Sequence, residues 1–243
     1  MDKDVSKITI MSNENELENL FLNTYDAKNL NVSPKNKTEL LEKYQKYTEL
    51  LYQYLRTVSG DFIFPVNNEI RAMLGHLSEY VESDEKKDKE LQRAYGHLRR
   101  INLDALKIIC DDFDKFFSKK MKKIYKYDYR DTLKSFLKIY AEKYFTAKNK
   151  YIDAQTKESV GSDSEKENDD KTGEEHNVIL LYFDAAKEYI ELKQYYEKYR
   201  KDIIKVKLQA NIGKIISFLV IGFCLIVSFA DIWPVIQGWI LNR

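Results

Sequence analysis

The chain has 243 residues, a formal net charge of +1 at pH 7, and 33% charged residues. This length is enough for one helical core beside a membrane anchor, and it excludes a large multidomain enzyme. Only eight glycines and three prolines are present, which favours long solvated helices over turn-rich sheets. The two cysteines, Cys110 and Cys224, offer no disulfide framework and no metal-site spacing, so a reducing compartment is expected.

The first 154 residues contain several amphipathic segments. A short one lies around Leu17 to Tyr25. Longer segments, with apolar residues three and four positions apart, are predicted over Lys37 to Thr57, Val66 to Val81, Lys86 to Ile124 and Asp131 to Ala154. Short connections between helices are typical of an antiparallel bundle. Residues 1–154 are therefore predicted to form a helical bundle.

Residues 155–177 change abruptly to an acidic composition with few apolar side chains, which predicts a disordered linker or loop. A stalk helix is predicted over residues 178–209, because a heptad seam begins there. The seam comprises Tyr182, Ala185, Tyr189, Leu192, Tyr196, Tyr199, Ile203, Val206, Ala210, Gly213 and Ser217. Such a seam can join several copies of the chain, or it can pack back on the chain's own bundle.

The next segment, residues 210–232, is predicted to cross a membrane. The run from Ile215 to Ala230 carries no charge, and Ile212 to Ile232 reach roughly 31 Å as a helix, close to a bilayer's hydrocarbon thickness. The N-terminus lacks the apolar stretch of a signal peptide. Basic residues precede the span and only Arg243 follows it, so we expect a single-pass inner-membrane protein with a cytoplasmic N-terminal domain and a short extracytoplasmic tail, residues 233–243.

One stripe of the span carries small or polar residues, whereas bulky phenylalanines fall elsewhere. We predict it to be the pore or oligomer face, comprising Ala210, Gly213, Lys214, Ser217, Cys224, Ser228 and Asp231. Alternatively, the serines hydrogen bond to carbonyls of their own helix. The predicted fold is thus all-α, a cytoplasmic antiparallel bundle with a long stalk helix leading into one C-terminal transmembrane helix.

Motifs of most enzyme classes are absent from the sequence: there is no phosphate-binding glycine loop, nucleophile elbow or zinc pattern. We therefore expect no enzyme activity, no cofactor and no metal. One exception is Arg71 followed five residues later by His76, which resembles the R-x4-6-H motif of the HEPN family of helical ribonucleases and nucleic-acid-associated domains. The resemblance implies that the arginine and histidine act at a dimer cleft on an RNA phosphodiester, so a membrane-anchored HEPN ribonuclease is the alternative function.

The tripeptide Gly-His-Leu occurs twice, at Gly75–Leu77 and Gly96–Leu98. Glycine inside a helix is unfavourable, so each copy predicts the close approach of another helix or of a ligand. Four residues next to the second copy share one helix face, namely Arg93, His97, Arg100 and Lys107, and Arg99 lies nearby; together these five are the predicted phosphate-binding residues. A solvated charged face is the alternative. A lysine-rich run between Lys115 and Lys126 complements a helix C-terminus or contacts lipid or nucleic acid.

A HEPN-like helical domain with paired Gly-His-Leu elements, an acidic insertion and one C-terminal span resembles the small membrane effectors of bacterial anti-phage defence, nearest to the membrane effector of the Hailong system. The resemblance implies a homo-oligomeric ion channel in the lipid bilayer. It implies a nucleotide or oligodeoxynucleotide ligand, made by a partner nucleotidyltransferase, and membrane depolarisation on activation. One span cannot enclose a pore alone, so several copies are expected around an axis. A helical membrane adaptor is a further alternative.

Overall fold

The computed structural model describes residues 15–60, 63–81, 85–125, 133–163 and 172–241, and these residues are all helical apart from short connections. Residues 15–24 form the first helix. The labelled elements follow in chain order as α2 (Ala27–Leu30), α3 (Lys37–Lys43), the π-helical turn η1 (Tyr44–Thr48), α4 (Glu49–Ser59), α5 (Phe64–Glu79), α6 (Lys87–Tyr125), α7 (Lys134–Asp163) and α8 (Thr172–Leu241). The prediction of an all-helical protein is confirmed for this part of the chain.

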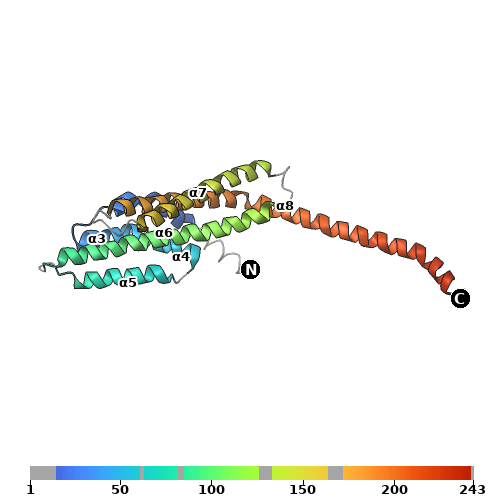
Figure 1. Ribbon diagram of the computed structural model, residues 1–243. Helices are drawn as coiled ribbons and strands as arrows, with labels where there is room; N and C mark the ends of the chain where they lie inside the picture. Colours follow the sequence, from blue (N-terminus) through green and yellow to red (C-terminus); the bar gives the residue numbers. More distant parts are fainter. Residues whose placement is uncertain (1–14, 61–62, 82–84, 126–132, 164–171, 242–243) are drawn as a thin grey trace.

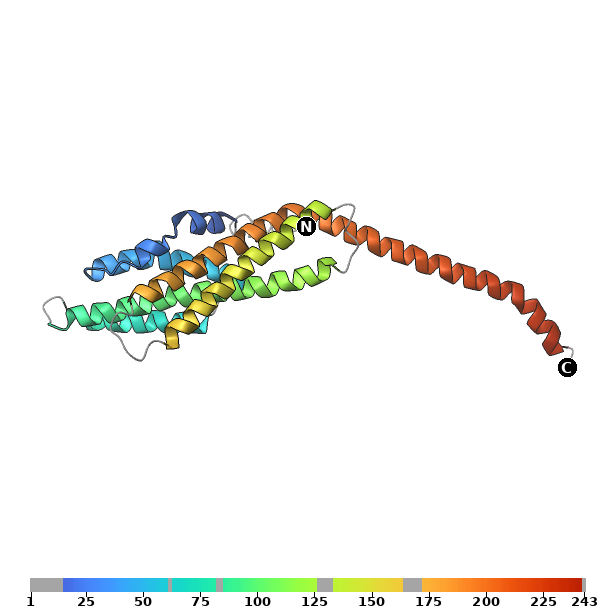
Figure 2. The same cartoon turned by 45° about the horizontal axis from the view of Figure 1, so that its top comes forward.

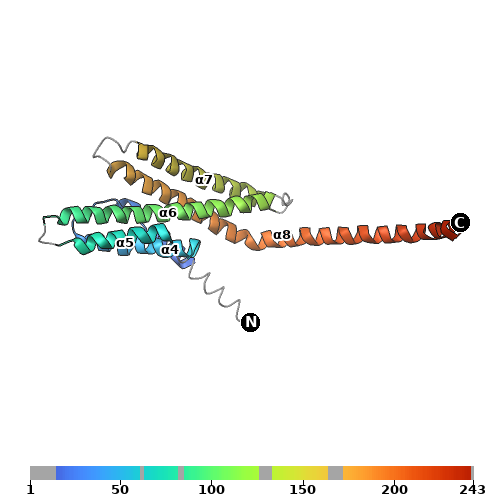
Figure 3. The same cartoon turned by 60° about the horizontal axis from the view of Figure 1, so that its bottom comes forward.

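The helices form an elongated bundle from which the second half of α8 projects (Figure 1). Helix α5 pairs with α6, α6 also contacts α4 and α8, and α7 packs along the first half of α8. The rotated views in Figures 2 and 3 show the same arrangement, with the C-terminal end of α6 close to the point where α8 leaves the bundle. The end of α5 and the start of α6 lie at the opposite end of the bundle, away from the projecting helix.

Aromatic side chains fill the interface among α6, α7 and α8. The ring of Tyr189 on α8 is parallel to that of Phe117 on α6, with 6.3 Å between centroids. The Tyr189 hydroxyl donates to Asp114 Oδ1 at 3.0 Å, and the Tyr144 hydroxyl from α7 donates to the same oxygen at 3.1 Å. Lys148 also pairs with Asp114 at 3.5 Å, so one partly buried carboxylate connects the three helices at the edge of the aromatic core.

The N-terminal segments are fixed to the bundle by buried polar contacts. The Tyr25 hydroxyl donates to Asn102 Oδ1 at 3.1 Å, and Asn102 Nδ2 donates to Thr48 Oγ1 at 2.8 Å. The Glu18 carboxylate, 1% exposed, accepts from Lys193 Nζ at 2.6 Å. These contacts join residues 15–24 and η1 to α6 and α8, so the short predicted N-terminal helix belongs to the bundle.

Most predicted helices have their expected positions, but the predicted linker over residues 155–177 is too long. Helix α7 continues to Asp163 and α8 begins at Thr172, while residues 164–171 lie outside the described part of the chain. Glu158 explains the extension, because it accepts a hydrogen bond from the Tyr182 hydroxyl at 2.7 Å and forms an ion pair with Lys107. The last turns of α7 therefore have partners on α6 and α8 that composition alone does not reveal.

The heptad seam packs within the chain over its first half, as the intramolecular alternative predicted. The seam residues from Tyr182 to Ile203 include six buried ones, Tyr182, Ala185, Tyr189, Leu192, Tyr196 and Ile203. The stalk predicted for residues 178–209 is therefore a core helix of the bundle up to about Ile203, and only its end projects. This half of the seam is unavailable to a second copy, because α6 and α7 already cover it.

Beyond Ile203, α8 leaves the bundle and exposes its apolar side chains. Within the described residues it is the helix that is long and apolar enough to cross a membrane, with an 18-residue stretch of mean hydropathy 1.7 that is not buried in the chain. Phe218, Leu219 and Leu225 are among the most exposed side chains, at 77%, 68% and 66%. Because this largely apolar stretch is not covered by the other described parts of the chain, lipid suits it as surroundings.

Candidate functional site

The two Gly-His-Leu elements belong to a longer duplication on the paired helices α5 and α6. In each copy a glutamate lies seven residues before the histidine and is followed by isoleucine or leucine. The copies are EIRAMLGHL, residues 69–77, and ELQRAYGHL, residues 90–98. Since the two helices contact each other and run in opposite directions (Figure 1), each glutamate lies beside the histidine of the other copy.

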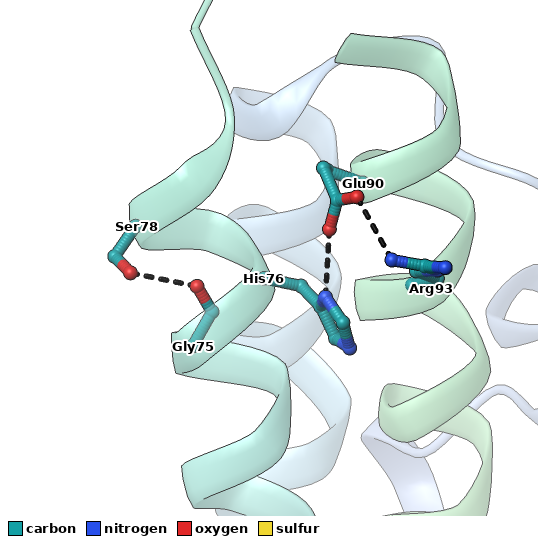
Figure 4. A network of polar contacts seen from close by, with 5 residues as sticks. All are labelled: Gly75, His76, Ser78, Glu90 and Arg93. Carbon is teal, nitrogen blue, oxygen red and sulfur yellow. Dashed lines mark hydrogen bonds and ion pairs between the residues drawn. The ribbon is translucent and has the colours of Figure 1, made fainter. Parts of the chain in front are cut away.

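The duplication creates two reciprocal glutamate–histidine pairs. His76 Nδ1 lies 2.7 Å from Glu90 Oε2, and His97 Nδ1 lies 2.6 Å from Glu69 Oε2. The two imidazole rings stack with their centroids 5.2 Å apart and an angle of 15° between planes. Figure 4 shows His76 projecting from α5 towards Glu90 and Arg93 of α6. A local two-fold relation between the helices therefore places two similarly held histidines together.

Each carboxylate determines which nitrogen of its histidine carries a proton. A glutamate that accepts a hydrogen bond from Nδ1–H leaves Nε2 as the unprotonated nitrogen of a neutral imidazole. The hydrogen bond from His76, together with the nearby Arg93, lowers the pKa of Glu90 below its ordinary value. Arg93 Nη1 donates to Glu90 Oε1 at 3.0 Å, so both oxygens of Glu90 have partners. The histidine side chains remain about one-fifth exposed, at 24% for His76 and 21% for His97.

The glycines of the duplication face open space within the described chain. A methyl group added at Gly75 or Gly96 would meet no atom within 4 Å, and both residues are exposed. Packing of another helix of the same chain, one predicted reason for these glycines, is therefore wrong. Approach by a ligand or another molecule stays a prediction.

The five predicted phosphate-binding residues do not form one accessible basic surface. Arg93 and Arg100 are exposed, whereas Arg99 is 6% exposed and lies over the ring of Tyr95 with 6.0 Å to its centroid. Arg99 follows Leu98 on the buried side of α6, so its prediction as a phosphate-binding residue is wrong in this conformation. His97 is held by Glu69, and Lys107 forms ion pairs with Asp104 and Glu158. Neighbouring acids thus balance much of the positive charge that the sequence suggested.

Arg71 and His76, the alternative catalytic pair, lie on the same helix but point in different directions. Positions five residues apart are separated by about 140° around an α-helix. Arg71 is exposed, while His76 points towards α6 and its Nδ1 contacts Glu90. Within one copy of the chain the two side chains therefore do not converge on one substrate atom.

The described members of the predicted pore face lie on the projecting part of α8. Gly213, Lys214, Ser217 and Cys224 are exposed in the single chain, and the side chains of Ala210, Ser228 and Asp231 lie outside the described part. The Ser217 hydroxyl donates to the Gly213 carbonyl oxygen at 2.9 Å. The alternative of a serine bonded to its own helix is thus confirmed for Ser217, whose oxygen still faces outwards with acceptor capacity.

The lysine-rich run lies at the end of the bundle where α8 leaves it (Figures 1 and 3). Lys119, Lys122 and Lys123 occupy the last turns of α6 and are exposed, while Lys120 lies over the ring of Tyr196 with 5.3 Å to its centroid. These positions complement the negative end of the α6 dipole, as predicted. They also place positive charge near the start of the apolar helix, as at an anionic membrane surface.

The fold and the exposed apolar helix define the class of this protein: an all-helical bundle with one candidate membrane-spanning helix that continues from its core. The comparison with known proteins adds no closer assignment. No protein family, curated protein or solved structure matches the chain.

Proposed function

We propose that the chain is one subunit of an oligomeric membrane channel whose helical bundle controls the span. The observation that carries the proposal is the continuity of α8, which runs from Thr172 to Leu241 without a break. Its first half is core of the bundle, and its second half is the candidate span. A helix of this kind transmits tilting or rotation of the bundle directly into the membrane, because no flexible linker separates the two parts.

Several copies are needed because one helix encloses no lumen. The seam residues buried within the bundle cannot join copies, so contact between subunits falls to the projecting part of α8. Gly213, Ser217 and Cys224 share the seam register there, and small side chains let neighbouring helices approach closely. The N-terminal bundle would lie in the cytoplasm, on the side where Lys201, Lys205 and other basic residues precede the span.

The proposed ligand is a nucleotide or an oligodeoxynucleotide, made by a partner nucleotidyltransferase, as the resemblance to anti-phage effectors implies. Arg93 and Arg100 are the exposed arginines of the predicted set, and a phosphate can reach them without opening the bundle. Binding through His97 or Lys107 requires their carboxylate partners to be displaced. To shift the assembly almost completely between closed and open packings, the ligand must prefer one of them by roughly 5 kcal/mol.

The test measures membrane potential with a voltage-sensitive dye in cells that express the full chain or a chain truncated after Lys207. Depolarisation by the full chain alone is expected. Ser217→Leu should change the current of the purified protein in planar bilayers, because it adds bulk to the seam stripe. The matched control is Phe218→Leu, on a neighbouring exposed position outside the stripe. Unchanged current with Ser217→Leu, or depolarisation by the truncated chain, contradicts the proposed channel.

The ribonuclease is retained as a second candidate because of the His76–Glu90 pair. A carboxylate that holds Nδ1–H prepares Nε2 to accept a proton, which is the arrangement of a general base. Arg71 would have to act on a substrate shared with another copy, since it points away from His76. RNA cleavage that His76→Ala abolishes, in protein that keeps its helical content, would support this function. Toxicity of the His76→Ala protein equal to that of the unaltered chain would remove it.

A further inference from the structure

The membrane-distal end of α5 and α6 carries a cluster of one imidazole and two carboxylates that the proposed channel does not use. A ligand atom from each of His76, Glu79 and Glu90 lies within 4.8 Å of those of the other two. His76 and Glu79 lie three residues apart on α5, so they share one face of the helix. Glu90 reaches them from α6, where its Oε2 lies 2.7 Å from His76 Nδ1.

We infer that His76, Glu79 and Glu90 form a binding site for one divalent first-row transition-metal ion. One imidazole and two carboxylates are ligands that Zn²⁺, Mn²⁺ and Fe²⁺ accept. Ligand atoms on a tetrahedral Zn²⁺ lie about 3.4 Å apart, given metal–ligand distances of about 2.1 Å. The 2.7 Å contact between His76 and Glu90 must therefore widen by about 0.7 Å on metal binding, while Glu79 moves inwards by a change of side-chain rotamer.

The charge around the histidines favours a cation over a phosphate. Glu69, Glu79 and Glu90 supply three carboxylates close to two imidazoles, and Arg93 donates a hydrogen bond to Glu90. Arg93 is 48% exposed and belongs to the surface, so it can turn into solvent when a metal ion neutralises Glu90.

The duplication explains why we assign one ion rather than two. Residues of α5 correspond to residues of α6 through the pairs Glu69 with Glu90 and His76 with His97. By the same correspondence the position of Glu79 on α5 is occupied on α6 by Arg100, which is a cation and cannot bind a metal ion. The copy around His97 therefore keeps its carboxylate–histidine pair but lacks the third ligand. His97 instead stacks on His76 and restricts the orientation of its ring.

The test is calorimetric titration of the full-length protein in detergent with Zn²⁺ alone, in a buffer that does not bind zinc. One ion per chain is expected. Glu79→Gln and His76→Gln should each weaken binding by at least about tenfold, since changes even around metal ligands cost about 10–100-fold. Glutamine at residue 76 keeps an amide that can donate to Glu90, so the helix pair retains a hydrogen bond.

The matched control is His176→Gln, which removes the histidine that lies outside the two Gly-His-Leu elements. This variant should bind Zn²⁺ within about threefold of the unaltered protein, well below the loss expected for a ligand. Co²⁺ should give visible absorption bands in the unaltered protein, and Glu79→Gln should lose them. Equal losses from His176→Gln and His76→Gln, or equally weak binding by every variant, would overturn the assigned site. The readout is independent of whether the chain conducts ions.

Discussion

Replacing Lys193 with methionine tests how residues 15–24 are held on α8. Both carboxylate oxygens of Glu18 accept hydrogen bonds, from Lys193 Nζ at 2.6 Å and from Gln194 Nε2 at 2.9 Å. Methionine preserves the apolar stem but removes the ammonium group, so the buried carboxylate loses its cation. Removing one member of a buried ion pair costs about 3–5 kcal/mol. For a chain of this size that loss lowers Tm by roughly 6–20 °C.

The measurement is thermal unfolding of the detergent-solubilised protein by differential scanning fluorimetry. Lys143→Met is the matched control, because Lys143 pairs with Glu191 of the same helix α8 at 3.4 Å but on the surface. An exposed pair contributes about 0–1 kcal/mol, which corresponds to a decrease of less than about 4 °C. The double variant Glu18→Gln/Lys193→Met should recover most of the lost stability, because no charge is left buried. A decrease with Lys193→Met no larger than that with Lys143→Met would refute the reasoning.

Three further predictions concern single side chains. Burial raises the pKa of the Cys110 thiol well above its ordinary value, so in Cys224→Ser protein a thiol reagent such as DTNB should detect no reactive cysteine until denaturant is added. Because the pKa of Glu90 is lowered in the fold, its carboxylate stabilises the protein above the ordinary carboxyl pKa, and this stabilisation is lost as the pH falls through the lowered pKa. The Tm of Glu90→Gln should therefore depend less on pH in the acid range than the Tm of the unaltered protein. Gly75→Ala and Gly96→Ala should each raise Tm by about 1–4 °C, because alanine adds about 0.5–1 kcal/mol of helix stability. At both positions no atom obstructs the added methyl group. A decrease in Tm would indicate that another molecule packs there.

Helix positions followed from the sequence because apolar periodicity and few helix breakers are local signals. The predicted segments over Val66 to Val81 and Lys86 to Ile124 agree with α5 and α6 to within about two residues, the usual uncertainty of helix ends. The end of α7 was missed for a different reason. Residues 155–163 have a composition typical of linkers, but Glu158 gains partners on two other helices, and such tertiary contacts leave no local pattern.

The heptad seam shows why periodicity alone does not identify a helix's partner. A regular apolar stripe fits a second copy of the chain as well as helices of the same chain, and here α6 and α7 cover it up to Ile203. The prediction of Arg99 as a phosphate-binding residue fails for a related reason. Arg99 belongs to a run of two arginines, and adjacent residues differ by about 100° in direction, so one of them turns towards the core.

The reciprocal histidine pairs were only half visible in the sequence. The repeated Gly-His-Leu elements are plain in the sequence, but no local pattern indicates that the glutamate seven residues before each histidine belongs to the same site. On one helix, positions seven residues apart lie two turns from each other and cannot bond, so the spacing suggested no contact. The signal has meaning only for two antiparallel copies, in which each glutamate meets the histidine of the other helix.

The position of this site limits how it can act on the projecting half of α8. The histidine pairs lie at the end of α6 away from the projecting half of α8, and the contacts of α6 with α8 are farther along, at Phe117 and Cys110. The Cys110 thiol lies 3.5 Å from the Tyr182 carbonyl oxygen, and Phe117 stacks on Tyr189. Closely packed interiors resist gradual deformation, so an event at the histidines reaches α8 only if α6 moves as a unit. In the proposed channel, the open and closed states would then differ in how α6 packs against α8. Asp114 would favour one of these two packings, because it accepts hydrogen bonds from both Tyr144 and Tyr189.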